Sequence, residues 1–107
     1  MLVSIITVAF NSEQTIRKTI ESVLNQTYPE IEYIIVDGAS KDGTAMIASE
    51  YIDLFASREG CSLTVISEPD MGMYDALNNG ARIATGELVG QINADDWYES
   101  DAVEKMF

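Results

Sequence analysis

The sequence predicts an α/β domain in which a mainly parallel sheet is covered by helices on both faces. Apolar runs typical of buried strands alternate along the chain with segments of helical periodicity. Each expected strand is almost entirely apolar, as in parallel sheets buried on both sides, and the intervening helices would form right-handed crossovers. With 107 residues, 47% of them apolar, the chain has the size and composition of one three-layer α/β/α domain.

The first half of the chain contains two strand-helix units. Residues 2–8 are rich in Val and Ile and predict a strand, and Asn11 and Ser12 are candidate N-caps for the next helix. Residues 31–36 form the second apolar run, which is followed by a polar turn and a second helical pattern. We expect the buried faces of the two helices to carry Ile16, Ile20, Val23 and Leu24, and Ile47, Tyr51, Leu54 and Phe55.

The second half repeats the alternation. Residues 63–66 predict a third strand, residues 88–92 a fourth and buried one, and Ser100 is a candidate cap for a last helix from Asp101 onward. Because that helix has no capping glycine and no following strand, we expect the chain to belong to a longer protein. In the helix between the last two strands, we expect the face toward the sheet to carry Met73, Ala76, Leu77, Gly80 and Ile83.

Composition limits the possible functions. The formal net charge of -12, from 18 acidic and 6 basic residues, excludes a nucleic-acid-binding surface, and a phosphate ligand would need a cation as intermediary. The single cysteine, Cys61, allows no internal disulfide and favours a reducing compartment. There is no histidine, so carboxylates must carry any acid-base chemistry. The N-terminal apolar run is too short for a membrane span and lacks the basic start of a signal peptide.

Two adjacent carboxylates, Asp95 and Asp96, follow the apolar run 88–92. Unpaired charge at the end of a core strand costs several kcal/mol unless a donor or cation compensates it. With the Asn93 amide oxygen nearby, these hard oxygen ligands suit Mg²⁺ or Mn²⁺. The alternative is a solvated acidic turn that caps the next helix.

Polar residues follow all four expected strands. Asn11, Asp37, Asp70 and Asp95 each come after a strand's C-terminal end. Open α/β sheets bind their ligands at that edge, so we expect these four loops to converge on one site.

Five segments, taken together and in order, resemble the family 2 glycosyltransferases of GT-A fold. They are Ser4–Asn11, Val36–Thr44, Glu68–Ala76, Ala84–Glu87 and Asn93–Asp96. The resemblance implies a truncated GT-A fold, in which residues 1–107 are the nucleotide-sugar (donor) binding part of a glycosyltransferase domain and the acceptor-binding part lies outside the chain.

The resemblance also implies roles for individual residues. The loop Thr7–Phe10 would lie against the nucleoside, and Asp37 would accept a hydrogen bond from a uracil-type base, the alternative being a turn residue before Gly38. Residues 42–44 are interpreted as a turn and helix start. The donor-binding residues expected are Thr7, Ala9, Phe10, Asn11, Asp37, Asp70, Tyr74, Asn93, Ala94 and Asp95, and the metal ligands are Asp95 and, as second choice, Asp96.

Asn93–Asp95 occupies the place of the family's Asp-x-Asp signature, with an uncharged amide at the first position. The resemblance implies a divalent cation, Mn²⁺ or Mg²⁺, that bridges the donor diphosphate and neutralises the leaving group. It implies inverting transfer of a sugar from a UDP-linked or similar donor to a glycan or lipid-linked acceptor, in cell-surface polysaccharide assembly. No residue here matches the family's general base, so we expect the isolated chain to bind donor without turnover.

Two other classes of protein share part of this pattern. A response-regulator-like phosphoacceptor module also places acids at strand ends with Mg²⁺, but it needs a lysine at a late strand end. A dinucleotide-binding domain needs glycines after the first strand, and residues 9–13 contain none. We expect a cytoplasmic protein, with peripheral association at the inner face of the membrane as an open alternative, and self-association through apolar surface that the truncated sheet exposes.

Overall fold

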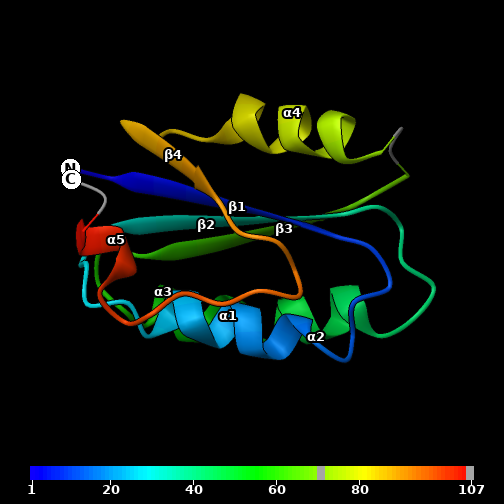
Figure 1. The fold of residues 1–107 in the computed structure, drawn as a ribbon, viewed down its shortest axis with the longest axis horizontal. Coiled ribbons are helices and arrows are strands. Elements are labelled where there is room, and N and C mark those ends of the chain that lie inside the picture. The colour runs from blue at the N-terminus through cyan, green and yellow to red at the C-terminus, as the bar shows by residue number, and fades with distance from the viewer. Residues whose placement is uncertain (70–71, 106–107) are drawn as a thin grey trace.

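The structure of the chain, a computed structural model, describes residues 1–69 and 72–105. The elements follow one another as β1 (Val3–Ala9), α1 (Ile16–Leu24), β2 (Ile31–Asp37), α2 (Thr44–Glu50), α3 (Ile52–Ala56), β3 (Ser62–Ser67), α4 (Met73–Ile83), β4 (Leu88–Gln91) and α5 (Ala102–Lys105). Within the described residues, four strands form one parallel sheet in the order β3-β2-β1-β4. Helices α1, α2 and α3 lie on one face and α4 on the other (Figure 1), which confirms the three-layer α/β/α fold.

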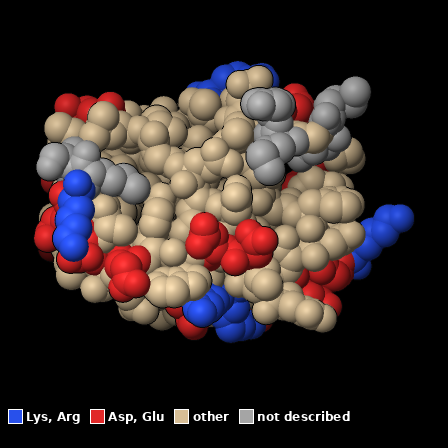
Figure 2. Space-filling view, in the orientation of Figure 1, with Lys and Arg blue, Asp and Glu red and all other residues tan. Residues whose placement is uncertain are grey.

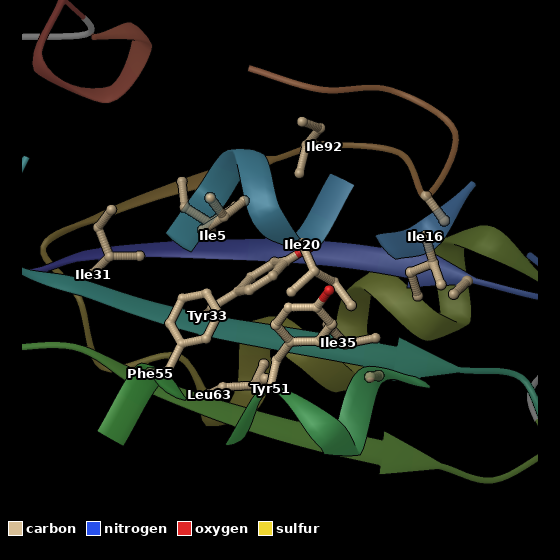
Figure 3. Close-up of a cluster of buried hydrophobic side chains, with 14 of the residues drawn as sticks. Ile5, Ile16, Ile20, Ile31, Tyr33, Ile35, Tyr51, Phe55, Leu63 and Ile92 are labelled. Carbon is tan, nitrogen blue, oxygen red and sulfur yellow. The ribbon is translucent and has the colours of Figure 1, made fainter. Parts of the chain in front are cut away.

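The two inner strands carry the core. Successive side chains of a strand point to opposite faces, and on β1 and β2 both sets are buried. The larger cluster lies between the sheet and α1–α3, and Figure 3 labels Ile5, Ile16, Ile20, Ile31, Tyr33, Ile35, Tyr51, Phe55, Leu63 and Ile92 in it. The smaller cluster, on the α4 side of the sheet, contains Ile6, Ile34, Val36 and Ala76.

Gly80 allows α4 to approach the sheet closely. A Cβ atom added at this position would come within 2.9 Å of Cγ2 of Ile6 and 3.2 Å of Cγ2 of Val36. The inward face predicted for this helix is therefore correct at Gly80 and at buried Ala76. It is wrong at Ile83, which is 40% exposed, and the side chain of Met73 lies outside the described part of the chain.

The prediction of a buried fourth strand is wrong. Leu88 is 42% exposed and Val89 is 54% exposed, because β4 is an edge strand of the described sheet, while α4 packs on β1 and β2. Only Ile92, just beyond the strand, is buried. The expected apolar surface is thus present, and self-association through it stays a prediction.

The helices also depart from the sequence pattern. The helix expected around residues 44–56 is two helices that meet at Tyr51, and Leu54 on the second is 51% exposed instead of buried. The Tyr51 hydroxyl lies between Glu21 and Arg17 of α1, donating to the first at 2.8 Å and accepting from the second at 3.0 Å. The first helix begins at Ile16 with Thr15 at the N-cap, so the expected capping by Asn11 or Ser12 side chains is wrong.

Arg58 connects the end of α3 with the end of α1. Its guanidinium donates to the carbonyl oxygens of Leu24 at 2.6 Å, Gln26 at 2.6 Å and Tyr28 at 2.7 Å. The last carbonyls of a helix have no partner within it, so this side chain satisfies the carbonyl of Leu24 and also two carbonyls of the loop that follows α1. None of the helices in the described ranges has the length and apolar character that crossing a membrane requires.

We expect Arg58→Met to lower the free energy of unfolding by about 2 kcal/mol, because three charge-assisted hydrogen bonds are lost. Urea denaturation followed by circular dichroism measures this change. Arg82→Met is the matched control, since Arg82 is exposed on α4 and donates to Asn79 at the surface. Equal free energies of unfolding for the two variants would contradict the stabilising role given to the Arg58 hydrogen bonds.

Candidate functional site

Parallel pairing brings the ends of β1, β2 and β3 to one end of the sheet. Ala9 at the end of β1 lies opposite Asp37 at the end of β2, which lies opposite Ser67 at the end of β3. These ends meet at the right of Figure 1. β4 ends earlier, with Gln91 opposite Ile6, and the chain then leaves the sheet and crosses toward α1 (Figure 1).

The loops after β1 and β2 are joined by hydrogen bonds through Asn11. Its N–H donates to Oγ of Ser40 at 2.7 Å, and its Oδ1 accepts the N–H of Lys41 at 2.9 Å. Asn11 has φ +48° and Ala39 has φ +60°, so both loops contain a left-handed turn residue. Asparagine tolerates this conformation better than most residues, whereas alanine is strained in it. The two loops therefore hold each other in a fixed arrangement.

A second set of bonds joins the same loops further from the sheet. The N–H of Ser12 donates to Oγ1 of Thr44 at 2.7 Å, and the N–H of Gly43 donates to Oε2 of Glu13 at 2.9 Å. Asp42 accepts the N–H groups of Thr44 and Glu13, and the hydrogen bonds from Thr44 hold the pKa of the Asp42 carboxyl below its usual range. Residues 42–44 form the predicted turn and helix start, and they also bind the neighbouring loop.

Asp37 is fully buried and its carboxylate is already hydrogen-bonded within the protein. Oδ2 accepts the N–H of Ser40 at 2.9 Å and the hydroxyl of Ser67 at 2.7 Å, and Oδ1 accepts the hydroxyl of Ser40. A carboxylate has about four acceptor sites, so these three bonds leave one for a further donor.

The other predicted residues on β1 or directly after it are Thr7, Ala9 and Phe10, and they differ in how far their side chains are exposed. Thr7 is fully buried and its Oγ1 lies 2.7 Å from the Tyr33 hydroxyl, so its side chain faces the core. Ala9 is buried, and its carbonyl accepts the N–H of Gly38. Phe10 is 60% exposed at the end of the strand and offers an apolar ring at the rim of the site. Of this group, Phe10 is the side chain that a nucleoside could contact directly.

Two predicted residues cannot be placed by their side chains. Asp70 lies outside the described residues, and of Tyr74 the structure describes only the backbone, in the first turn of α4. Their expected contacts with the donor stay predictions.

Residues 93–96 form the acidic turn, in which the backbone carbonyl of Asn93 accepts the N–H of Asp96 at 3.1 Å. The side chains of Asn93, Asp95 and Asp96 are exposed, whereas Ala94 is buried. Oδ1 of Asp96 accepts the N–H of Trp97 at 2.8 Å. The prediction that Asp95 and Asp96 end a core strand is therefore wrong, because the strand before them lies at the edge of the described sheet. The two residues lie in an exposed turn, as the alternative interpretation held.

The donor set fits a hard divalent cation. Asp95, Asp96 and Asn93 present carboxylate and amide oxygens to solvent, and Mg²⁺ is commonly held by one or two carboxylates together with substrate phosphates. Among the residues that the structure describes, no group of three or more His, Cys, Asp or Glu side chains could hold a metal ion by itself. These residues would thus hold a cation together with a phosphate ligand.

The surface charge agrees with such an arrangement. Figure 2 shows acidic side chains at several places on the face crossed by the C-terminal segment, and basic side chains mainly near its rim. Lys18 lies beside the acidic loop, with its Nζ 4.9 Å from the centre of the Trp97 ring. A diphosphate approaching this face meets mostly negative charge, which a bound cation would offset.

The sequence matches the family described as Glycosyl transferase family 2 over residues 4–107. The chain belongs to this family. Family membership decides against the phosphoacceptor and dinucleotide-binding alternatives, and all the loops described above lie within the matched residues.

Two curated relatives cover nearly the whole chain. EpsH of Bacillus subtilis is 36% identical over 104 residues, which are 97% of this chain and 29% of that protein. Chondroitin synthase of Escherichia coli is 37% identical over 103 residues, 96% of this chain and 14% of that protein. The chain therefore spans less than a third of either relative.

Two solved structures resemble the fold. TarS of S. aureus, solved with UDP-GlcNAc, superposes with a TM-score of 0.85 at 27% identity, over 99% of this chain and 30% of that chain. The mannosyltransferase PcManGT of Pyrobaculum calidifontis, solved with GDP-Man and Mn²⁺, gives 0.80 at 30% identity, over 90% and 28%. The four-stranded sheet with its helices is thus the counterpart of part of a larger glycosyltransferase fold.

Sequence reasoning missed the residues that support the site. Ser40 and Ser67 hold Asp37, and Thr15 and Thr19 donate to the carbonyls of Ala94 and Asp96. Ser40 and Ser67 lie far apart in the sequence and follow no helical or strand spacing that would have identified them. The threonines do, because they lie four residues apart and therefore on one face of a helix.

We expect Ser40→Ala to lower the free energy of unfolding by about 1 to 3 kcal/mol, because the buried Asp37 carboxylate and the N–H of Asn11 both lose a partner. Ser49→Ala is the control, because Ser49 is exposed on α2 and bonds only back to Ala45 in the same helix. Thermal and urea unfolding of both variants give the comparison. A Ser40→Ala protein as stable as Ser49→Ala would show that the loop network does not constrain the fold.

Proposed function

We propose that this chain is the donor-binding part of a metal-assisted glycosyltransferase. Its ligand is a nucleoside-diphosphate sugar, a UDP-sugar in the first instance, and a divalent cation, Mn²⁺ or Mg²⁺, would be held by the acidic turn and would neutralise charge on the diphosphate. The observation that carries the proposal is the exposed Asn93–Asp96 turn in a chain of this family. Structural neighbours bound to UDP-GlcNAc, and to GDP-Man with Mn²⁺, support both the ligand class and the cation.

Each part of the site has a separate task. Asp95, and secondarily Asp96, hold the cation, and Asn93 offers an uncharged oxygen to a ribose hydroxyl or a metal-bound water. The exposed Phe10 ring contacts the nucleoside at the end of β1. Asp37 accepts an imide N–H of the base through its remaining acceptor site, which would favour uracil.

The bound cation would supply charge neutralisation at the departing diphosphate. The protein's part is to orient that diphosphate over the acidic turn and to hold the nucleoside against the joined loops that follow β1 and β2. No general base is assigned to residues 1–107, so the chain by itself binds donor and does not transfer the sugar. Acceptor choice and inversion at the sugar are assigned to residues outside this chain.

The proposed setting is polysaccharide assembly on the cytoplasmic side of a membrane. The acceptor would be a glycan or a lipid-linked sugar, in line with the relative named chondroitin synthase. The cytoplasmic assignment rests on a chain whose single cysteine, Cys61, is a free thiol.

Calorimetric titration of UDP into the chain, with Mn²⁺ and again with EDTA, tests the proposal. We expect binding with Mn²⁺ and a loss of at least about tenfold in affinity with EDTA or in Asp95→Asn, equivalent to about 1.4 kcal/mol. Asp53→Asn is the matched control, because it removes the same charge from an exposed position on α3.

Binding that ignores both EDTA and Asp95→Asn would contradict the metal assignment. A parallel titration with GDP examines the base preference. Equal affinities for UDP and GDP would remove the proposed role of Asp37 in choosing the base, without affecting the role of Asp95.

A further inference from the structure

A stripe of polar side chains runs along one face of α1 and continues past both ends of the helix. The stripe consists of Thr15, Thr19, Ser22 and Gln26, spaced four, three and four residues apart, so the side chains lie above one another along the helix. It runs beside the buried apolar stripe of the same helix, which contains Ile16, Ile20 and Val23. Thr19 and Gln26 are themselves buried.

Every member of the stripe bonds to the backbone of residues 94–103, the segment that begins in the acidic turn. Thr15 donates to the carbonyl of Ala94 at 2.9 Å, and Thr19 donates to the carbonyl of Asp96. Ser22 accepts the N–H of Tyr98 at 3.1 Å. Gln26 donates to the carbonyl of Glu99 at 2.7 Å and accepts the N–H of Val103 at 3.0 Å.

These bonds replace the strand neighbour that the segment lacks. Beyond Ile92 the chain leaves the sheet, and buried or half-buried backbone groups then need partners from elsewhere. The stripe supplies them from a helix that is itself fixed against the core. Figure 1 shows the segment running along α1 toward α5.

The first two bonds flank Asp95. The carbonyls on either side of it, those of Ala94 and Asp96, are held by hydroxyls one helical turn apart, a separation of about 6 Å along the axis. The turn itself is closed by the bond between Asn93 and Asp96. The Asp95 side chain therefore extends into solvent from a backbone that is fixed on both sides.

We infer that Thr15 and Thr19 are positioning residues for the cation site, acting through the carbonyls of Ala94 and Asp96 to fix the backbone of Asp95. The inference rests on the proposed function, which makes Asp95 a metal ligand. A neutral hydroxyl suits this task, because it orients the carbonyl without adding charge and without competing for the cation. A metal ligand must be held within about 0.5 Å of its working position, which an unsupported turn does not achieve.

The stripe provides its own control. Ser22 and Gln26 hold the distal part of the segment, whereas Thr15 and Thr19 hold the acidic turn. If the whole stripe only attached the segment to α1, removing a bond at either end would change stability, and any effect on cation binding would be the same at both ends. If Thr19 positions Asp95, loss of its hydroxyl weakens cation binding more than loss of the Ser22 hydroxyl does.

The test measures Mn²⁺ affinity in the presence of UDP, by the electron paramagnetic resonance signal of free Mn²⁺, alongside the melting temperature. We expect Thr19→Val to weaken Mn²⁺ binding by about tenfold, as loss of a supporting hydrogen bond around a metal site does. Thr19→Ser restores the affinity because it keeps the hydroxyl. Ser22→Ala lowers the melting temperature and keeps the Mn²⁺ affinity, and Thr64→Val, at an exposed position of β3, changes neither.

A Thr19→Val chain that binds Mn²⁺ as tightly as the unsubstituted chain would overturn the inference and leave the proposed function standing. Equal weakening by Thr19→Val and Ser22→Ala would also overturn it, because attachment of the segment would then explain the effect. An unsubstituted chain with no UDP-dependent Mn²⁺ binding would overturn the proposed function itself, and the inference with it.

Discussion

The parallel pairing of β1 with both β2 and β4 decides where functional side chains can lie in this chain. Because the strands run in one direction, the loops after β1 and β2 share an edge, and hydrogen bonds between Asn11, Ser40 and Lys41 join them there. The same pairing ends β4 opposite Ile6, which releases the following segment to cross α1. Both halves of the proposed donor site thus follow from the register of one central strand.

The two halves are held by different means. The nucleoside side consists of loops that bond to each other and to the buried carboxylate of Asp37, so it is fixed close to the core. The cation side is the exposed acidic turn. The hydroxyls of Thr15, at the N-cap of α1, and Thr19, within α1, hold its backbone carbonyls. This difference has a chemical reason, since carboxylates that bind a cation together with its nucleotide must be accessible, whereas a buried pair of adjacent acids without a cation would be costly.

Sequence patterns predicted what depends on local periodicity. The Val- and Ile-rich runs of β1 and β2, the buried stripe of α1 and the alternation of strands with helices all follow from it, as does the shared edge of the loops. The failures concern tertiary context. Leu88 and Val89 are as apolar as core residues yet exposed, because burial of an edge strand depends on a neighbour that the pattern cannot show. The bond of the Tyr51 hydroxyl to Glu21 and that of Ser67 to Asp37 each join residues 30 positions apart, which local periodicity does not show.

The central claim is that a cation and a nucleotide meet between the acidic turn and the ends of β1 and β2. Paramagnetic broadening of backbone amide signals by Mn²⁺ in the presence of UDP tests it most directly. The account predicts that the amides of Asp95 and Asp96 disappear first, followed by those near Phe10 and Ser40, while Gly60 at the opposite end of β3 stays sharp. Broadening centred on the acids around α5, or spread evenly over the acidic surface, would contradict it.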